Sequence, residues 1–92
     1  MTKSEQMLMK NIRHLHFISN LSRIAWCKEL GISRQIVGAW FEERALPQTS
    51  HLQKISKKLK ISIDYLVRKD LSKMDIYDVR SNYMIIQKYL AL

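Results

Sequence analysis

Very few residues in this chain interrupt a helix. Its 92 residues include two glycines and one proline, which leaves few positions where a helix would be broken. Apolar residues recur at intervals of three and four positions instead of alternating, and no Asn-Gly or Asp-Gly pair marks a hairpin. The sequence therefore predicts an all-α fold, and its 47% of apolar residues is enough for a modest core.

Helix-start signals divide the chain into six predicted helices. Each begins after a residue whose side-chain oxygen can accept a hydrogen bond from a first-turn amide, and three carry a capping-box partner three positions later. Gly31 supplies the left-handed conformation that ends the second helix. The predicted caps are Thr2 (with Glu5), Ser22, Ser33, Ser50 (with Gln53), Ser62 and Ser72 (with Asp75).

The apolar stripes of these helices predict the core. They place one side of each helix inward, and in the third helix they leave the opposite side free. The predicted inward residues of the first, fourth and fifth helices are Leu8, Ile12, Leu15, Ile18, Leu52, Ile55, Leu59, Ile63, Leu66 and Val67.

The stretch from Leu21 to Phe41 carries the strongest functional signal. Two short predicted helices are joined there by a turn of three to four residues that contains Gly31, which is the arrangement of a helix-turn-helix. The small Cys27 lies where the two helices are predicted to cross closely. The predicted inward residues are Leu30, Ile32, Ile36, Val37 and Trp40, and the predicted outward residues are Arg34, Gln35, Gly38 and Ala39.

This pattern resembles the lambda-repressor/Cro-type (XRE-like) helix-turn-helix domain, and small phage repressors in particular. The resemblance covers about residues 8–70, including the loop with Pro47, the predicted helix over 52–59 and the closing segment 61–67. It implies a five-helix DNA-binding domain over residues 1–70, followed by a C-terminal helix over 71–92 for dimerisation or partner binding. Two features depart from the family pattern. Arg23 stands where Gln is common, and Glu42 and Glu43 follow the recognition helix where members often approach DNA.

The charge of the chain agrees with a nucleic-acid partner. The net charge is +8, and residues 1–60 carry eleven basic and four acidic side chains. Such an excess attracts polyanions. The densest basic cluster, at Lys54, Lys57, Lys58 and Lys60, is predicted to be a solvated face that adds long-range attraction.

The resemblance implies roles for individual residues. Arg34 and Gln35 lead the recognition helix, where Arg can bind guanine and Gln can bind adenine through two hydrogen bonds each; the alternative for Arg34 is a phosphate contact. Gly38 and Ala39 would let the helix lie close to the bases. The residues expected to bind phosphate are Ser22, Arg23, Ser33, Arg44, Thr49, Ser50 and His51.

Other classes of site find little support in the sequence. His14, His16 and Cys27 have no metal-ligand spacing, and neither GxSxG nor a P-loop occurs. We therefore expect no cofactor, no metal and no enzymatic activity. With a single cysteine, no signal-peptide pattern and no apolar run long enough for a bilayer, we expect an intracellular protein. The resemblance to phage repressors implies the cytoplasm of a bacterial host cell.

The last predicted helix carries an apolar seam suited to a partner helix. We expect a homodimer held by this seam, and the alternative is a tail packed on its own domain. About 22 residues follow the fifth predicted helix, so we do not expect the self-cleaving domain that larger repressors carry. The seam residues are Ile76, Val79, Tyr83, Ile86 and Leu90.

The resemblance implies a phage or prophage repressor that occludes a promoter on a double-stranded operator and is released by a protein antirepressor. The alternative is an antitoxin-like module that regulates its own operator and binds a toxin through its C-terminal helix. A more distant alternative is a protein that coats nucleic acid without sequence preference.

Overall fold

The computed structural model describes residues 1–73. They form α1 (Lys3–Ser19), α2 (Arg23–Leu30), α3 (Arg34–Phe41), α4 (Thr49–Leu59), α5 (Ile63–Arg68) and a 3-10 turn, η1 (Leu71–Lys73). No strand occurs in this range, so the all-α prediction is confirmed. The predicted sixth helix lies outside the described residues, together with its seam of Ile76, Val79, Tyr83, Ile86 and Leu90.

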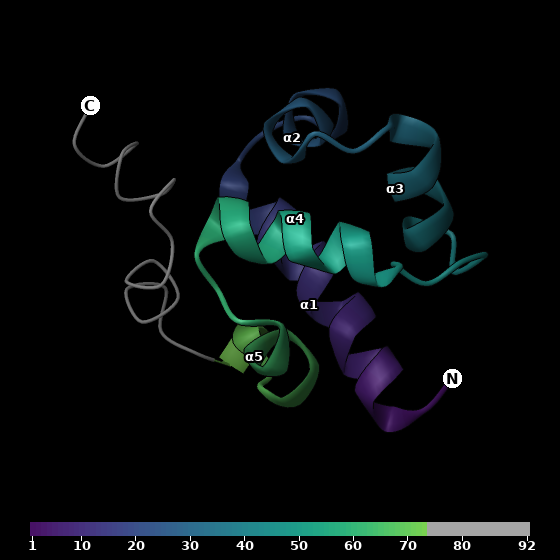
Figure 1. Ribbon diagram of the computed structural model, residues 1–92, viewed down its shortest axis with the longest axis vertical. Coiled ribbons are helices and arrows are strands. Elements are labelled where there is room, and N and C mark those ends of the chain that lie inside the picture. The colour runs from purple at the N-terminus through teal and green to yellow at the C-terminus, as the bar shows by residue number, and fades with distance from the viewer. Residues whose placement is uncertain (74–92) are drawn as a thin grey trace.

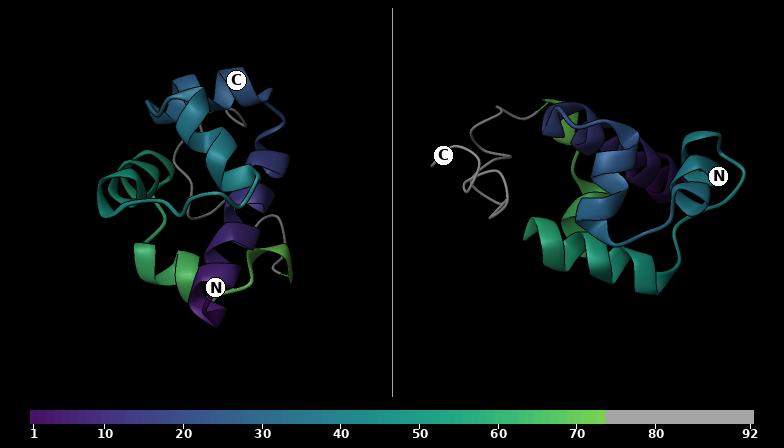
Figure 2. Two further views of the ribbon diagram at one scale, coloured as in Figure 1. Left: turned by 90° about the vertical axis from the view of Figure 1, so that its right-hand side faces the viewer. Right: turned by 90° about the horizontal axis from the view of Figure 1, so that it is seen from above.

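The helices are arranged around α1, the longest of them. α1 packs against α2, α3, α5 and η1, while α4 packs against α2 and α5. Figure 1 shows α4 crossing in front of α1, with α2 and α3 on one side of the crossing and α5 on the other. The left view in Figure 2 places α5 and the N-terminal end of α1 at the end of the molecule opposite α2.

One apolar core connects all of these elements. Most of the predicted inward residues are buried in this core. Ile18, Ile36, Leu52 and Val67 are half-buried and pack against it, whereas Ile63 is half-buried and is not among the residues that pack against it. The buried apolar residues are Leu8, Met9, Ile12, Leu15, Trp26, Cys27, Leu30, Ile32, Val37, Trp40, Ile55, Leu59, Ile61, Leu66 and Leu71.

Most predicted helix starts are confirmed. Thr2 and Glu5 form the capping box, with the Thr2 amide 2.8 Å from Oε1 of Glu5. Ser22, Ser33 and Ser62 each accept a hydrogen bond at Oγ from the amide three residues later. These caps depend only on local sequence, which is why they can be predicted.

The start of α4 differs from the prediction of a Ser50–Gln53 capping box. Gln48, which follows Pro47, has the extended backbone of an N-cap (φ −80°, ψ 164°), and the helix begins at Thr49. The amide of Gln48 donates to Nδ1 of His51 at 3.4 Å. An imidazole nitrogen therefore takes the place of the usual carboxylate or amide oxygen, and Ser50 lies inside the helix.

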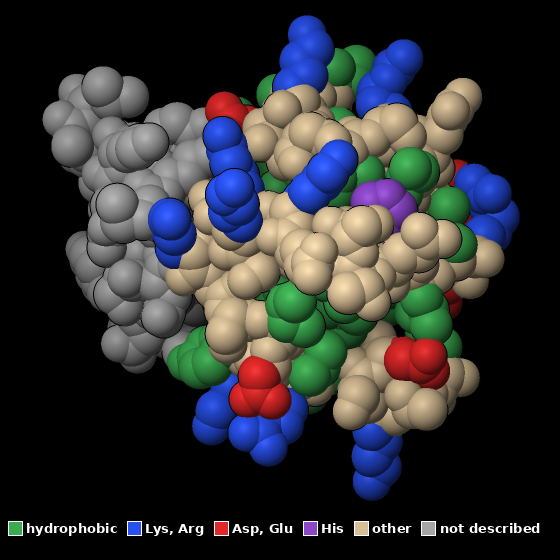
Figure 3. Space-filling view, viewed as in Figure 1, with side chains coloured by type: hydrophobic (Ala, Val, Ile, Leu, Met, Phe, Trp, Pro, Cys, Tyr) green, Lys and Arg blue, Asp and Glu red, His purple; other side chains and the backbone are tan. Residues whose placement is uncertain are grey.

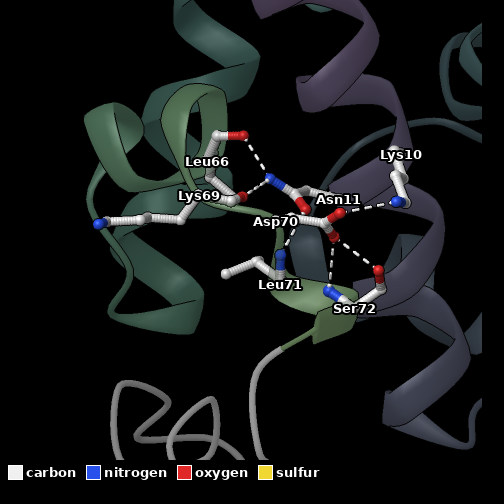
Figure 4. A network of polar contacts seen from close by, with 7 residues as sticks. All are labelled: Lys10, Asn11, Leu66, Lys69, Asp70, Leu71 and Ser72. Atoms are coloured by element: carbon white, nitrogen blue, oxygen red, sulfur yellow. Dashed lines mark hydrogen bonds and ion pairs between the residues drawn. The ribbon is translucent and has the colours of Figure 1, made fainter.

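Asn11 joins α1 to the C-terminal end of α5. Its side chain is fully buried, and Nδ2 donates to the carbonyls of Leu66 and Lys69, both at 2.6 Å. Its Oδ1 accepts from the amide of Leu71 at 3.0 Å (Figure 4). A side chain of α1 thus satisfies the backbone groups that α5 and η1 leave open.

An ion pair lies beside this network. Nζ of Lys10 is 2.7 Å from Oδ2 of Asp70, and Oδ1 of Asp70 accepts from the amide and hydroxyl of Ser72 (Figure 4). The hydrogen bonds from Lys10 and Ser72 lower the pKa of Asp70 to about 2. The carboxylate therefore stays ionised and keeps η1 attached to α1.

We predict that Asn11→Ala destabilises the protein by about 2–4 kcal/mol, because buried carbonyls and an amide lose their partners. Urea unfolding followed by circular dichroism measures this. Gln53→Ala, which removes an exposed amide side chain, is the matched control and should change stability by less than about 0.5 kcal/mol. Equal effects of the two substitutions would contradict the role given to Asn11.

Candidate nucleic-acid interface

The turn between α2 and α3 is held from two sides. Gly31 has φ 71°, and its amide donates to the carbonyl of Cys27 at 2.9 Å. Its own carbonyl accepts from Nζ of Lys54, in α4, at 3.0 Å. This hydrogen bond ties α4 to the turn, although Lys54 itself is exposed. Lys57, Lys58 and Lys60 are also exposed, as predicted.

The inner side of the helix-turn-helix is closely packed. Trp26 and Cys27 of α2 and Val37 and Trp40 of α3 are all at most 3% exposed. Burial raises the pKa of the Cys27 thiol, which keeps it neutral. The predicted role of Cys27 as a small residue at the helix crossing fits this burial.

An aromatic cluster connects α1, α2 and α3. The ring of His16 lies 5.1 Å from that of Trp26 and 5.4 Å from that of Phe41, measured between centroids. Arg23 covers Phe41 from outside, with Cζ 4.6 Å from the ring centroid. This cation–π contact holds the guanidinium of Arg23 at the N-terminal end of α2 before any ligand binds.

The outer side of α3 is partly as predicted. Arg34 and Gln35 are exposed in its first turn, and Ala39 is half-buried. Gly38 is buried, which corrects the expectation that it faces solvent. A Cβ built on Gly38 meets no other atom within 4 Å, so the space beside it is open although its backbone is covered.

Three helix N-termini carry the other predicted contact residues. Ser22 and Ser33 use Oγ to cap α2 and α3, while Thr49 and Ser50 are exposed in the first turn of α4. The ring of His51 contacts Trp40 edge-on at 5.6 Å. First-turn amides without intrahelical acceptors, together with the helix dipole, favour phosphate binding at such ends.

The carboxylates after α3 are paired with cations of the protein. Nε of Arg44 is 2.8 Å from Oε2 of Glu42, and the same contact lowers the pKa of Glu42. Glu43 pairs with Arg13 of α1 at 3.1 Å. Arg44, predicted to bind phosphate, is thus engaged by Glu42, and the two carboxylates are balanced where the chain leaves α3.

The basic side chains do not form one stripe. In Figure 3, Lys and Arg project from several sides of the visible face, with fewer Asp and Glu among them. Such a distribution provides general attraction to a polyanion. We therefore expect the exposed first turn of α3 and the neighbouring helix N-termini, and not the distribution of charge, to determine which face binds nucleic acid.

Residues 1–73 contain no group of three His, Cys, Asp or Glu side chains arranged to hold a metal ion. In the same range, no helix combines the length and hydrophobicity needed to cross a bilayer.

Sequence reasoning missed Asn11, Arg13 and Lys54, whose side chains fix the framework of the site. Asn11 gave a signal, because it lies on the apolar stripe of α1 between Leu8 and Leu15. Arg13 and Lys54 gave none, since each binds a carbonyl more than twenty residues away in sequence.

The sequence of this chain also matches a known protein family. Residues 19–66, just over half of the chain, match the sequence profile of a family described as helix-turn-helix. The matched range contains all of α2, α3 and α4. Comparison with curated proteins and with solved structures found no match.

We predict opposite effects for the same substitution at the two glycines. Gly38→Ala should stabilise the protein by about 0.5–1 kcal/mol, because it is helical and the added methyl meets open space. Gly31→Ala should destabilise it by about 1–2 kcal/mol, because φ is positive there although the space is equally open. Thermal unfolding measures both, and a loss of stability in Gly38→Ala would contradict the packing described for α3.

Proposed function

The chain belongs to the lambda-repressor/Cro-type (XRE-like) helix-turn-helix family and is a DNA-binding transcription regulator, and from this premise we propose that α3 reads the base sequence of a specific operator. The observation that supports this most directly is the exposure of Arg34 and Gln35 in the first turn of a helix whose opposite side is fixed in the core.

Base reading follows from the chemistry of these two side chains. When the N-terminal end of α3 enters the major groove, Arg34 donates two hydrogen bonds to O6 and N7 of a guanine, and Gln35 pairs with N6 and N7 of an adenine. Ala39, one turn later, touches a thymine methyl.

Phosphate contacts fix the register of α3 in the groove. We assign them to the N-terminal ends of α2 and α4, where Ser22, Thr49 and Ser50 lie, and to the side chain of Arg23. The position of Arg23 over Phe41 supports this assignment, because a guanidinium that is already held loses less conformational freedom on binding. Ser33, His51 and Arg44 are secondary candidates, and Arg44 must leave Glu42 to take part.

The regulatory part of the proposal rests on the sequence of residues 75–92 and on the family. We propose a homodimer that places two recognition helices in successive major grooves, about 34 Å apart, on a pseudo-palindromic operator. A dimer bound over a promoter excludes the polymerase, as a phage or prophage repressor does. Release then comes from an antirepressor protein that binds the free repressor more tightly than the DNA-bound form.

We predict that Arg34→Ala weakens binding to a duplex selected by the wild-type protein from a random pool by about 1–3 kcal/mol and relaxes one base position. Gel-shift titration at a stated salt concentration measures both effects. Lys57→Ala, which removes an exposed positive charge from α4, is the control. Equal losses on selected and random DNA would contradict base reading by Arg34.

We predict that a chain truncated after Lys73 keeps the helical domain but binds the selected duplex without cooperativity. The core residues described above, including Leu71, lie within residues 1–73, whereas the predicted seam begins at Ile76. Sedimentation equilibrium with gel-shift titration tests this. A truncated chain that remains a dimer would place the subunit interface elsewhere.

A further inference from the structure

We propose that Arg13, on α1, is a positioning residue that fixes the C-terminal end of the recognition helix, an inference that rests on the proposed base reading by α3. One nitrogen of its guanidinium, Nη2, donates to the carbonyl of Phe41 at 3.3 Å and to Oε1 of Glu43 at 3.1 Å. Phe41 is the last residue of α3, so Arg13 contacts both the end of the helix and the chain that leaves it.

The contact completes the hydrogen bonding at this helix end. The carbonyls of Gly38, Ala39 and Trp40 accept from the backbone amides of Glu42, Arg44 and Glu43 at 3.0, 2.8 and 3.0 Å. The carbonyl of Phe41 then accepts from Arg13. A cation is the favourable partner for carbonyls at a helix C-terminus, and here it comes from another helix.

Arg13 also holds a backbone conformation that the sequence alone disfavours. Glu43 has φ 59°, in the left-handed region where residues other than Gly, Asn and Asp are uncommon. The ion pair with Arg13 anchors the Glu43 side chain while its backbone turns away from α3. Figure 1 shows the connection from α3 to α4 looping outward from this point before α4 begins.

Contacts at both ends of α3 fix its position for the proposed base reading. The N-terminal end of α3 is tied to α4 through the turn at Gly31 and Lys54, and its C-terminal end is tied to α1 through Arg13. Both the angle of α3 and the course of the chain from α3 to the N-terminal end of α4 depend on these two contacts. Arg13 thereby sets the register between base contacts from α3 and phosphate contacts from α4.

Substitutions at this ion pair distinguish an electrostatic role of Arg13 from a positioning role. Arg13→Ala removes a positive charge and Glu43→Ala removes a negative one, so a purely electrostatic role predicts opposite effects on DNA affinity. A positioning role predicts that both lower the ratio of affinities for selected and scrambled duplexes. Both side chains are about half exposed, at 43% and 50%, so the fold should tolerate either change.

The experiment measures this ratio for the full chain, with a duplex selected by the wild-type protein and a scrambled duplex of the same composition. We expect Arg13→Ala and Glu43→Ala each to lower the ratio about three- to five-fold, while Glu43→Ala raises affinity for the scrambled duplex. Arg13→Lys, which keeps the charge and one donor group, should recover part of the ratio. Lys57→Ala, the charge-matched control for Arg13→Ala, should leave the ratio unchanged.

The outcomes separate this proposal from the proposed function. A wild-type ratio of one overturns base reading and the positioning role together. A wild-type ratio well above one that Arg13→Ala and Glu43→Ala leave unchanged, or shift in opposite directions, overturns the positioning role alone. Unfolding midpoints measured in parallel check that both variants are folded; if Arg13→Ala is not, Glu43→Ala and Arg13→Lys carry the test.

Discussion

The carbonyl groups at the C-terminal ends of the short helices determine how this domain is assembled. α2 and α3 have eight residues each, so about half of their backbone carbonyls have no partner within the helix. Backbone amides that follow each helix supply most of the missing donors. Side chains from other helices add further donors: Lys54 at the turn after α2, Arg13 at the end of α3 and Asn11 at the end of α5. Each such bond satisfies a helix end and also fixes the distance between two helices.

These contacts reduce the number of cationic side chains that a ligand can reach. Lys54, Arg13 and Lys10 bind carbonyls or carboxylates of the protein, and Arg44 is paired with Glu42. These cations are therefore used in contacts within the protein. Figure 3 shows Lys and Arg side chains spread over the visible face. The proposed specificity comes from a few side chains in the first turn of a helix whose position these internal contacts set.

The sequence predicts features that depend on neighbouring residues. The caps at Ser22 and Ser33 and the left-handed Gly31 are confirmed, because a helix start or end is governed by a few adjacent residues. The start of α4 was misplaced because Gln48 is an unusual cap. The burial of Gly38 was missed because a glycine has no side chain whose polarity could indicate an inward or outward position.

Amide chemical-shift mapping of the full chain, titrated with a duplex that it selects from a random pool, identifies the helix that contacts the bases. Base reading by α3 predicts the largest shifts at Ser22 and Arg23, across the range 34–39, and at Thr49 and Ser50, with little change at the buried carbonyl bridges of Asn11. Shifts centred on the exposed lysines of α4, with residues 34–39 unaffected, would contradict the assignment of α3 as the recognition helix.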